Sequence, residues 1–226
     1  MCGIFISYGS ISRKDLKYYL KKITLRGKDT FGISYINSEN PKTFYYSYKN
    51  INFNECILST ESKNSLIIAN SRLITNGSNE KNTQPLTNNE LCMVHNGIVL
   101  DYTDLESNSI ELEQTNKSDT AVLFEQISSL LNTKNFFSEI ERYLNSLTGE
   151  INLVFYVKST NQLFYYTNNG SLFLNKNNKN IILFSEKNFF LKKYRKHVNQ
   201  INSNKLYNFS LKDDLKIYNS RNYKKI

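Results

Sequence analysis

The order of the predicted elements constrains this fold more than any other feature: a block of strands, two successive helices, and a second block of strands. Apolar residues at helical spacing predict the two central helices over 118–131 and 135–147, and an earlier helix over 12–25. Short apolar runs bounded by turn residues predict strands at 3–8, 32–36, 43–48, 66–69, 91–94, 151–157, 162–167, 172–174 and 181–185. This order indicates an α+β fold in which helices cover sheets.

The connections between these elements carry further expectations. Asn-rich turns separate the strands that follow Gly149, as a β-meander would require. Residues 70–90 are rich in Asn, Ser and Thr, and we expect an extended loop there. A short helix over 189–196 and a hairpin of 206–211 with 215–218 are expected near the end. No low-complexity linker or internal repeat divides the sequence, so we expect a single domain over 2–226, with Met1 removed.

Composition excludes several classes of protein. The 226 residues carry a net charge of +9, but the excess is lysine scattered among asparagine, which favours a solvated basic surface over nucleic-acid binding. The three cysteines are an odd number without a CxxC pair, which argues against a disulfide framework or a structural zinc site. No apolar run approaches the ~20 residues of a membrane span, and the start lacks the pattern of a signal peptide. We expect a cytoplasmic protein that binds neither nucleic acid nor membrane.

Glycine is scarce in this chain and unevenly placed. There are only eight glycines, and five of them lie in or beside the motifs described below: Gly3, Gly27, Gly32, Gly77 and Gly97. Glycine is needed where the backbone adopts a positive φ or approaches another group closely. Their clustering therefore indicates sites that make special demands on the backbone.

Cys2 is the first candidate for chemistry. Removal of Met1 would leave one residue with a thiol and a free α-amine. The thiol has an unperturbed pKa of about 8.5 and needs a base or a lowered pKa to react. The α-amine has a pKa of ~8 and can accept that proton. Cys2 can therefore be a nucleophile that carries its own base, although an early cysteine on its own is more often an ordinary small residue.

Five short segments occur in an order that resembles a known family. They are MCGI at 1–4, RGKDT at 26–30, SRLITNG at 71–77, VHNGI at 94–98 and SDT at 118–120. Together they resemble the glutaminase domain of class II glutamine amidotransferases, a group that includes glucosamine-6-phosphate synthase and asparagine synthetase. The resemblance extends along nearly the whole chain, to NGSL at 169–172 and FSE at 184–186.

The resemblance implies a fold and a reaction. The fold is a four-layer α/β/β/α sandwich of the N-terminal nucleophile hydrolase type. The reaction is hydrolysis of the side-chain amide of L-glutamine to glutamate and ammonia through a thioester on Cys2. No metal or organic cofactor is implied.

Glutamine is a zwitterion, and its two charges require partners. Arg72 offers a bidentate fork for the α-carboxylate, and Asp119 can pair with the α-ammonium. If Ser118 caps the following helix, Asp119 lies in the first turn, where a negative charge is favoured. Taken alone, each residue is more often a surface arginine or a carboxylate that complements a helix dipole.

Asn96 and Gly97 are the expected oxyanion hole. The Asn96 side-chain amide and the Gly97 N–H can stabilise the negative charge that develops on the carbonyl oxygen. An Asn-Gly pair is also typical of a type I′ turn, and a tight turn could present both donors. His95 is expected to be structural, because an N-terminal amine makes a Cys–His pair unnecessary.

The remaining motif residues are expected to support the site. By resemblance, Thr75, Asn76 and Gly77 belong to a loop that closes over glutamine. Arg26, Gly27 and Asp29 are expected to shape the backbone beside the nucleophile. Glucosamine-6-phosphate synthase has Trp at the position of Leu73 and His at that of Asn76, so an aromatic gate for ammonia is absent or built otherwise.

No acceptor domain is recognised after the glutaminase motifs. We therefore expect a separate synthetase or isomerase subunit that uses the ammonia. Three alternatives stay open: an N-terminal nucleophile amidohydrolase for another amide, a catalytically silent scaffold or regulatory subunit, and, in third place, a nucleic-acid binder.

Overall fold

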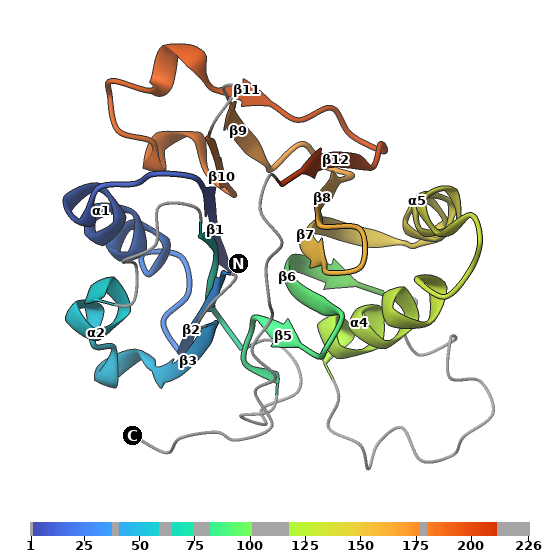
Figure 1. Cartoon of the computed structure of the whole chain (residues 1–226), viewed down its shortest axis with the longest axis horizontal. Helices are drawn as coiled ribbons and strands as arrows, with labels where there is room; N and C mark the ends of the chain where they lie inside the picture. Colours follow the sequence, from blue (N-terminus) through green and yellow to red (C-terminus); the bar gives the residue numbers. More distant parts are fainter. Residues whose placement is uncertain are drawn as a thin grey trace.

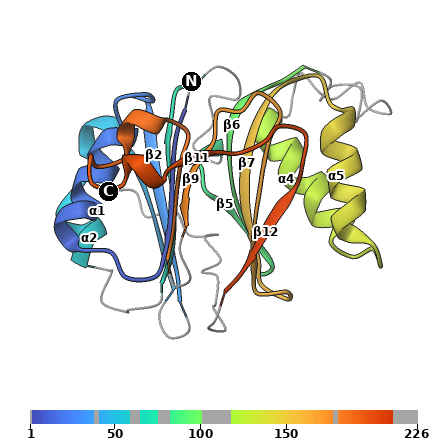
Figure 2. The same ribbon diagram turned by 90° about the horizontal axis from the view of Figure 1, so that it is seen from above.

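Two antiparallel sheets pack face to face, and helices cover the outer face of each one (Figures 1 and 2). The computed structural model describes residues 2–37, 41–58, 65–74, 82–100, 118–176 and 180–211. In Figure 2 the layers follow one another as helices, sheet, sheet and helices. The predicted four-layer α/β/β/α sandwich is confirmed.

Within the described residues the larger sheet has seven strands in the order β11-β9-β10-β1-β4-β2-β3. The strand β1 lies near its middle and pairs antiparallel with β10 and β4, so that Gly3 lies opposite Ser71. The bounds are β1 Gly3–Tyr8, β2 Thr30–Ile36, β3 Lys42–Ser47, β4 Leu66–Arg72, β9 Phe173–Lys176, β10 Ile181–Phe184 and β11 Asn199–Gln200.

The smaller sheet has the order β12-β8-β7-β6-β5 within the described residues. Its long central strands β6 and β7 pair along their whole lengths, with Asn96 opposite Asn152. The bounds are β5 Leu86–Thr87, β6 Leu91–Val99, β7 Gly149–Val157, β8 Gln162–Thr167 and β12 Tyr207–Ser210.

Each outer helix layer packs its apolar face on one sheet. The helix α1 (Arg13–Ile23) begins at Ser12, whose side chain accepts a hydrogen bond from the Asp15 N–H. It packs beside α2 (Phe53–Leu58) on the larger sheet. The helices α4 (Asp119–Leu130) and α5 (Phe136–Ser146) cover the smaller sheet. In the part of the chain that the structure describes, the short 3-10 helices are η1 Tyr48–Asn50, η4 Lys187–Phe189 and η5 Arg195–His197.

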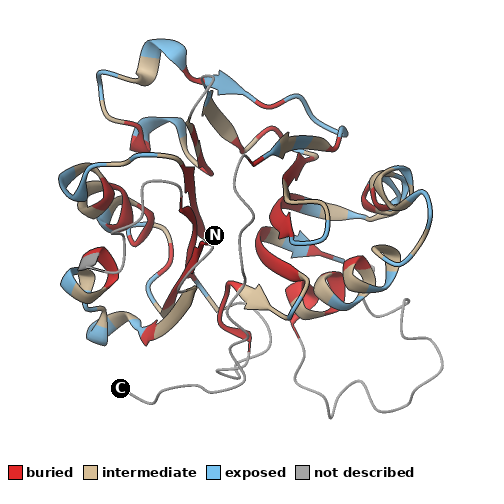
Figure 3. Ribbon diagram, in the orientation of Figure 1, coloured by how far each residue is buried: buried red, intermediate tan, exposed pale blue. Residues whose placement is uncertain are grey.

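The space between the sheets is apolar along most of its length and polar at one end. Ile4, Ile68, Val94 and Val154 belong to the core that joins the two sheets, and Figure 3 shows the buried strands that enclose it. Alternate residues of a strand share a face. Two positions from each of these apolar residues, on the same face of its strand, lies a polar residue. These are Cys2 just before β1, Asn70 on β4, Asn96 on β6 and Asn152 on β7.

Several expectations about the elements need correction. The strands after Gly149 do not form a meander, because β7 and β8 join the smaller sheet whereas β9 and β10 join the larger one. The helix expected over 189–196 is wrong, since that segment contains only parts of two 3-10 helices, η4 at its start and η5 at its end. The loop expected over 70–90 is interrupted, because β4 continues to Arg72 and β5 lies within it.

The hairpin predicted from 206–211 and 215–218 is confirmed only as far as its first strand. The strand predicted over 206–211 is β12, but its partner is β8, through Tyr207 opposite Tyr165. Residues 215–218 lie outside the described residues. Among the helices of the described part of the chain, none has the length and apolar character needed to cross a bilayer.

A matched pair of leucines tests the core. Leu153 of β7 is fully buried, whereas Leu25 is 60% exposed. Leu153→Ala should lower the free energy of unfolding by about 2–5 kcal/mol, because it removes apolar contacts and leaves a cavity. Leu25→Ala should change it by about 0.5 kcal/mol or less. Urea unfolding measures both values, and equal effects would contradict the placement of Leu153.

Candidate active site

Four separate elements meet at the polar end of the sandwich. Cys2 precedes β1, Arg72 ends β4, Asn96 and Gly97 lie in β6, and Asp119 opens α4. The two sheets contact each other here, because the Cys2 backbone nitrogen donates to Asn96 Oδ1 over 2.7 Å. Arg72 and Asp119 both act electrostatically on the Cys2 thiol. Residues far apart in the sequence are therefore brought together.

The Cys2 thiol is held in a partly buried position. Its Sγ lies 4.0 Å from the carbonyl oxygen of Leu73. Burial raises the pKa of the Cys2 thiol above its ordinary value, because the thiolate would lose solvation, and this outweighs the opposing influence of Arg72. The thiol is therefore neutral at rest near pH 7, and it needs a base at the moment of attack. Cys56 and Cys92 are fully buried among apolar side chains.

The start of β1 is fixed by residues that follow β10. The Ile4 N–H donates to Ser185 Oγ over 3.0 Å. Arg26 donates from Nη1 to the Ser185 carbonyl oxygen over 3.1 Å and contacts the Glu186 carboxylate at 3.3 Å. Arg26 thus lies against the backbone that supports the nucleophile-bearing strand.

Asn96 and Gly97 belong to a continuous strand, so the turn interpretation is wrong. The strand β6 runs to Val99 and stays paired with β7 throughout. Gly97 has φ +154°, and a Cβ added there would overlap the carbonyl oxygen of Glu150. Glycine is therefore required in the middle of this strand by conformation and by space.

The outer edge of β6 presents the Gly97 N–H. Successive N–H groups of a strand point to opposite edges. The His95 N–H donates outward to Gln84 Oε1 over 2.6 Å, and the Val99 N–H donates outward to Asp119 Oδ2 over 3.1 Å. The Gly97 N–H lies between them on the same edge, and within the described parts of the chain no acceptor takes it.

Asp119 lies where the sequence places it, in the first turn of α4. Ser118 is the N-cap, and its side chain accepts a hydrogen bond from the Ala121 N–H at 3.2 Å. The Asp119 carboxylate accepts from the Thr120 N–H at 2.8 Å and from the Val99 N–H. A carboxylate has about four acceptor positions, so the fixed carboxylate keeps capacity for a further donor.

Arg72 is buried at the end of β4, and its neighbours hold the strand end in place. Burial lowers the pKa of the Arg72 guanidinium, while Cys2, Asp119 and Asp29 oppose this effect. The Asp29 N–H donates to the Arg72 carbonyl at 3.0 Å, and Asp29 Oδ2 accepts from the Ile74 N–H at 2.6 Å. The Gly27 carbonyl accepts from Ser71 Oγ at 2.6 Å, and a Cβ on Gly27 would strike the Ser71 carbonyl.

His95 faces α4, away from Cys2. Its Nδ1 lies 3.2 Å from Thr120 Oγ1 and 4.0 Å from Asp119 Oδ2. Gln84 joins the same group, since its Nε2 donates to Thr120 Oγ1 over 3.2 Å. This buried network connects β6 to the start of α4, which agrees with a structural role for His95.

Thr75, Asn76 and Gly77 lie outside the described residues. Gln84, Asn152 and Thr167 lie outside the sequence motifs, although all three are buried and hydrogen-bonded beside the site. A polar residue at an inward position of a predicted strand was the available signal for Asn152 and Thr167. Among the described side chains, no group of three or more His, Cys, Asp or Glu residues gathers as a metal site would require.

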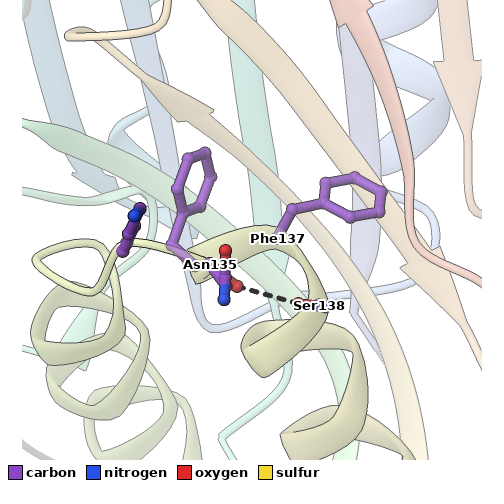
Figure 4. Close-up of a pocket in the computed structure, with 5 residues that line it drawn as sticks. Asn135, Phe137 and Ser138 are labelled. Atoms are coloured by element: carbon purple, nitrogen blue, oxygen red, sulfur yellow. Dashed lines mark hydrogen bonds between the residues drawn. The ribbon is translucent and has the colours of Figure 1, made fainter.

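A hollow of about 260 Å³ lies elsewhere, on the outer helix layer at the start of α5 (Figure 4). Asn135, Phe137 and Ser138 line it, together with Lys134 and Phe136. The Ser138 hydroxyl donates to the Asn135 carbonyl oxygen at 3.0 Å. The described chain places no cysteine or carboxylate in its lining, so this hollow is separate from the Cys2 site.

Comparison with known proteins shows the family to which this chain belongs. Residues 70–192, more than half of the chain, match the model of the glutamine amidotransferase domain family. A glutamine–fructose-6-phosphate aminotransferase from Acinetobacter baylyi is 27% identical over 66% of this chain and 25% of its own length. The corresponding protein from Bartonella quintana is 30% identical over 58% of this chain and 22% of its own length. The chain thus spans about a quarter of the length of these relatives.

Solved structures share the fold. The glutamine phosphoribosylpyrophosphate amidotransferase from B. subtilis superposes with a TM-score of 0.70 at 19% identity, over 98% of this chain and 50% of that one. A glutamine aminotransferase class-II domain protein from Silicibacter pomeroyi has a TM-score of 0.53 at 12% identity, over 92% and 94% of the two chains. The fold is that of the N-terminal nucleophile hydrolases.

The chain belongs to the glutamine amidotransferase domain family. The resemblance stated from its motifs is confirmed, and so is its assignment to a class of enzymes.

The two histidines of the chain test the buried network. Burial lowers the pKa of His95, outweighing the opposing influence of Asp119. An unfolded histidine has a pKa of about 6.5, so the unfolded state binds this proton at a higher pH than the folded state. The free energy of unfolding should therefore fall as the pH drops below ~6.5. Urea unfolding between pH 7.5 and 5 measures it.

The histidine prediction has a matched control. His95→Gln should lose this part of the pH dependence, whereas His197→Gln, at an exposed position, should keep it. A His95→Gln variant with the wild-type slope would contradict the placement of a neutral imidazole in the network.

Proposed function

We propose that this chain hydrolyses the side-chain amide of L-glutamine to glutamate and ammonia through a thioester on Cys2. The observation that carries the proposal is the contact between the Cys2 backbone nitrogen and Asn96 Oδ1 at 2.7 Å. It places the candidate nucleophile beside the candidate oxyanion donors. Membership in the glutamine amidotransferase domain family supports the same reaction.

Recognition of glutamine follows from the two charged residues at the site. The Arg72 guanidinium would bind the α-carboxylate through two parallel hydrogen bonds. The Asp119 carboxylate, fixed by the Val99 and Thr120 N–H groups, would accept from the α-ammonium. A substrate with both charges would be oriented with its carboxamide toward Cys2. Thr75, Asn76 and Gly77 remain candidates for a loop that closes over it.

Catalysis would begin with proton transfer within one residue. Removal of Met1 would convert the Cys2 nitrogen into an α-amine, which takes the thiol proton as sulfur attacks the amide carbon. Charge on the carbonyl oxygen would be stabilised by the Asn96 side-chain amide and the outward Gly97 N–H. The intermediate would collapse with loss of ammonia, which takes the proton from the α-ammonium. Water would then attack the thioester, releasing glutamate and the thiol.

The ammonia needs an acceptor. The relatives are named for transfer of an amino group from glutamine to fructose 6-phosphate. By analogy with that transfer, we propose that a synthetase or isomerase, as a separate subunit, consumes the ammonia. A pull-down from the native host that recovers only this chain, with full glutaminase activity alone, would contradict this arrangement.

A cysteine pair tests the nucleophile. Cys2→Ala should abolish ammonia release from L-glutamine, because no other described thiol lies at the site. Cys56→Ala removes a fully buried thiol of α2, in the outer helix layer, and should leave kcat near the wild-type value. A coupled glutamate assay measures both rates. Full activity in Cys2→Ala would overturn the proposal, as would a substrate panel in which another amide clearly surpasses glutamine.

An asparagine pair tests the oxyanion hole. Asn96→Ala removes one donor and should lower kcat by about 10²–10³-fold. Asn175→Ala removes a side chain whose amide donates to the Tyr194 and His197 carbonyl groups on the far edge of the larger sheet. Its kcat should stay near the wild-type value. Similar losses in both variants would show that Asn96 acts through stability alone.

A further inference from the structure

We infer that Asn152 and Thr167 are positioning residues that aim and polarise the Gly97 N–H through a relay of buried hydrogen bonds. The inference rests on the proposed function for its effect on rate, but the relay itself is a property of the fold. It assigns a role to two side chains that stand outside the motifs from which the family is identified.

The relay begins at the end of β8 and ends at the site. The Gly170 N–H donates to Thr167 Oγ1 at 2.9 Å, and the Thr167 hydroxyl donates to Asn152 Oδ1 at 2.7 Å. Asn152 Nδ2 then donates to the Asn96 carbonyl oxygen at 3.0 Å. Its side-chain members are almost completely excluded from solvent, with Thr167 at 0% and Asn152 at 1% exposure.

The peptide plane transmits the last bond to the site. The carbonyl of Asn96 and the N–H of Gly97 belong to one trans peptide unit, so they point in opposite directions. Holding the carbonyl toward β7 therefore aims the Gly97 N–H toward the outer edge of β6. The relay adds a side-chain bond to the restraint that pairing with β7 already gives, at a position where Gly97 has φ +154° and lacks a side chain that would limit its rotation.

All hydrogen bonds of the relay also point in the same direction along it. Each group in the relay donates toward Asn96, from the Gly170 N–H to the Thr167 hydroxyl and the Asn152 amide, and the Gly97 N–H is the final donor. Aligned hydrogen bonds polarise one another, and the effect is larger in a buried environment. The Gly97 N–H should therefore be a stronger donor to a developing oxyanion than an isolated peptide group.

Asn152 and Thr167 are polar at positions where packing of the core would favour apolar side chains. Asn152 and Thr167 lie opposite each other on neighbouring strands, on the face where Val154 and Tyr165 join the core between the sheets. Two apolar side chains would continue that core without the cost of burying polar groups. The polar pair instead stands level with Asn96, which lies opposite Asn152 on β6.

Substitutions of similar shape test the relay. Asn152→Leu removes its final side-chain donor and should lower kcat for L-glutamine by about 10–100-fold, less than deletion of an oxyanion donor, with KM within about twofold. Thr167→Val should lower kcat by about 3–10-fold, because the aligned polarisation is interrupted. Thr167→Ser keeps the hydroxyl and should restore the wild-type rate.

A spectroscopic readout is independent of activity. The chain has eight glycines, so selective ¹⁵N-glycine labelling gives a simple amide spectrum. The Gly97 amide proton should move upfield in Asn152→Leu and in Thr167→Val, and return in Thr167→Ser. Tyr156→Phe is the matched control: it removes a 3.0 Å hydrogen bond to Asn161 from the same face of β7 and should leave kcat and the Gly97 resonance unchanged.

The outcomes separate the relay from the reaction. Unchanged kcat and an unchanged Gly97 resonance in both Asn152→Leu and Thr167→Val would overturn the inference. If wild-type protein does not hydrolyse glutamine, the proposed function fails, while the Gly97 resonance still decides whether the relay exists. If Asn152→Leu does not fold, the Thr167→Val and Thr167→Ser pair decides the question alone.

Discussion

The hydrogen bond from the Cys2 backbone nitrogen to Asn96 Oδ1 joins the two sheets at the point where their shared core becomes polar. The site depends on this contact, because it brings the residue before β1 against the middle of β6. Three further anchors support it: Ser185 holds Ile4, Asp29 holds the end of β4, and Asp119 holds Val99. Each anchor pairs a polar side chain, buried in Ser185 and Asp119 and half-buried in Asp29, with a backbone N–H, so removing any one would leave a donor without its partner.

The site combines an apolar sandwich with a small set of fixed dipoles. Along β1, β4, β6 and β7 every second residue points inward. The last inward apolar residue, an Ile or a Val, is followed at the next inward position by a Cys or an Asn. The same strands therefore supply stability from their apolar positions and polar groups from the next inward position. The outer edge of β6 is used in the same way. Its alternate N–H groups bind Gln84 and Asp119, and the Gly97 N–H lies between them on the same edge.

Much of this arrangement could be predicted from the sequence. The apolar runs predict β1, β2 and β8, and the Ser118–Asp119 pair predicts the start of α4, because local patterns specify these features. The distribution of β7 to β10 between two sheets could not be predicted, since Asn-rich turns fit a hairpin and a crossover equally well. Asn96–Gly97 has the composition of a turn, but pairing with β7 overrides that local preference. The roles inferred for Asn152 and Thr167 depend on cross-strand neighbours that the sequence does not specify.

The central claim is that Cys2 is an N-terminal nucleophile in a site shaped for glutamine. The most direct measurement is the intact mass of the protein before and after treatment with 6-diazo-5-oxo-norleucine, an electrophilic glutamine analogue. We predict loss of Met1 and a single adduct that maps to Cys2, with excess glutamine slowing its formation. A retained Met1 with no adduct would contradict the claim and would leave a catalytically silent scaffold or regulatory subunit as the better account of this chain.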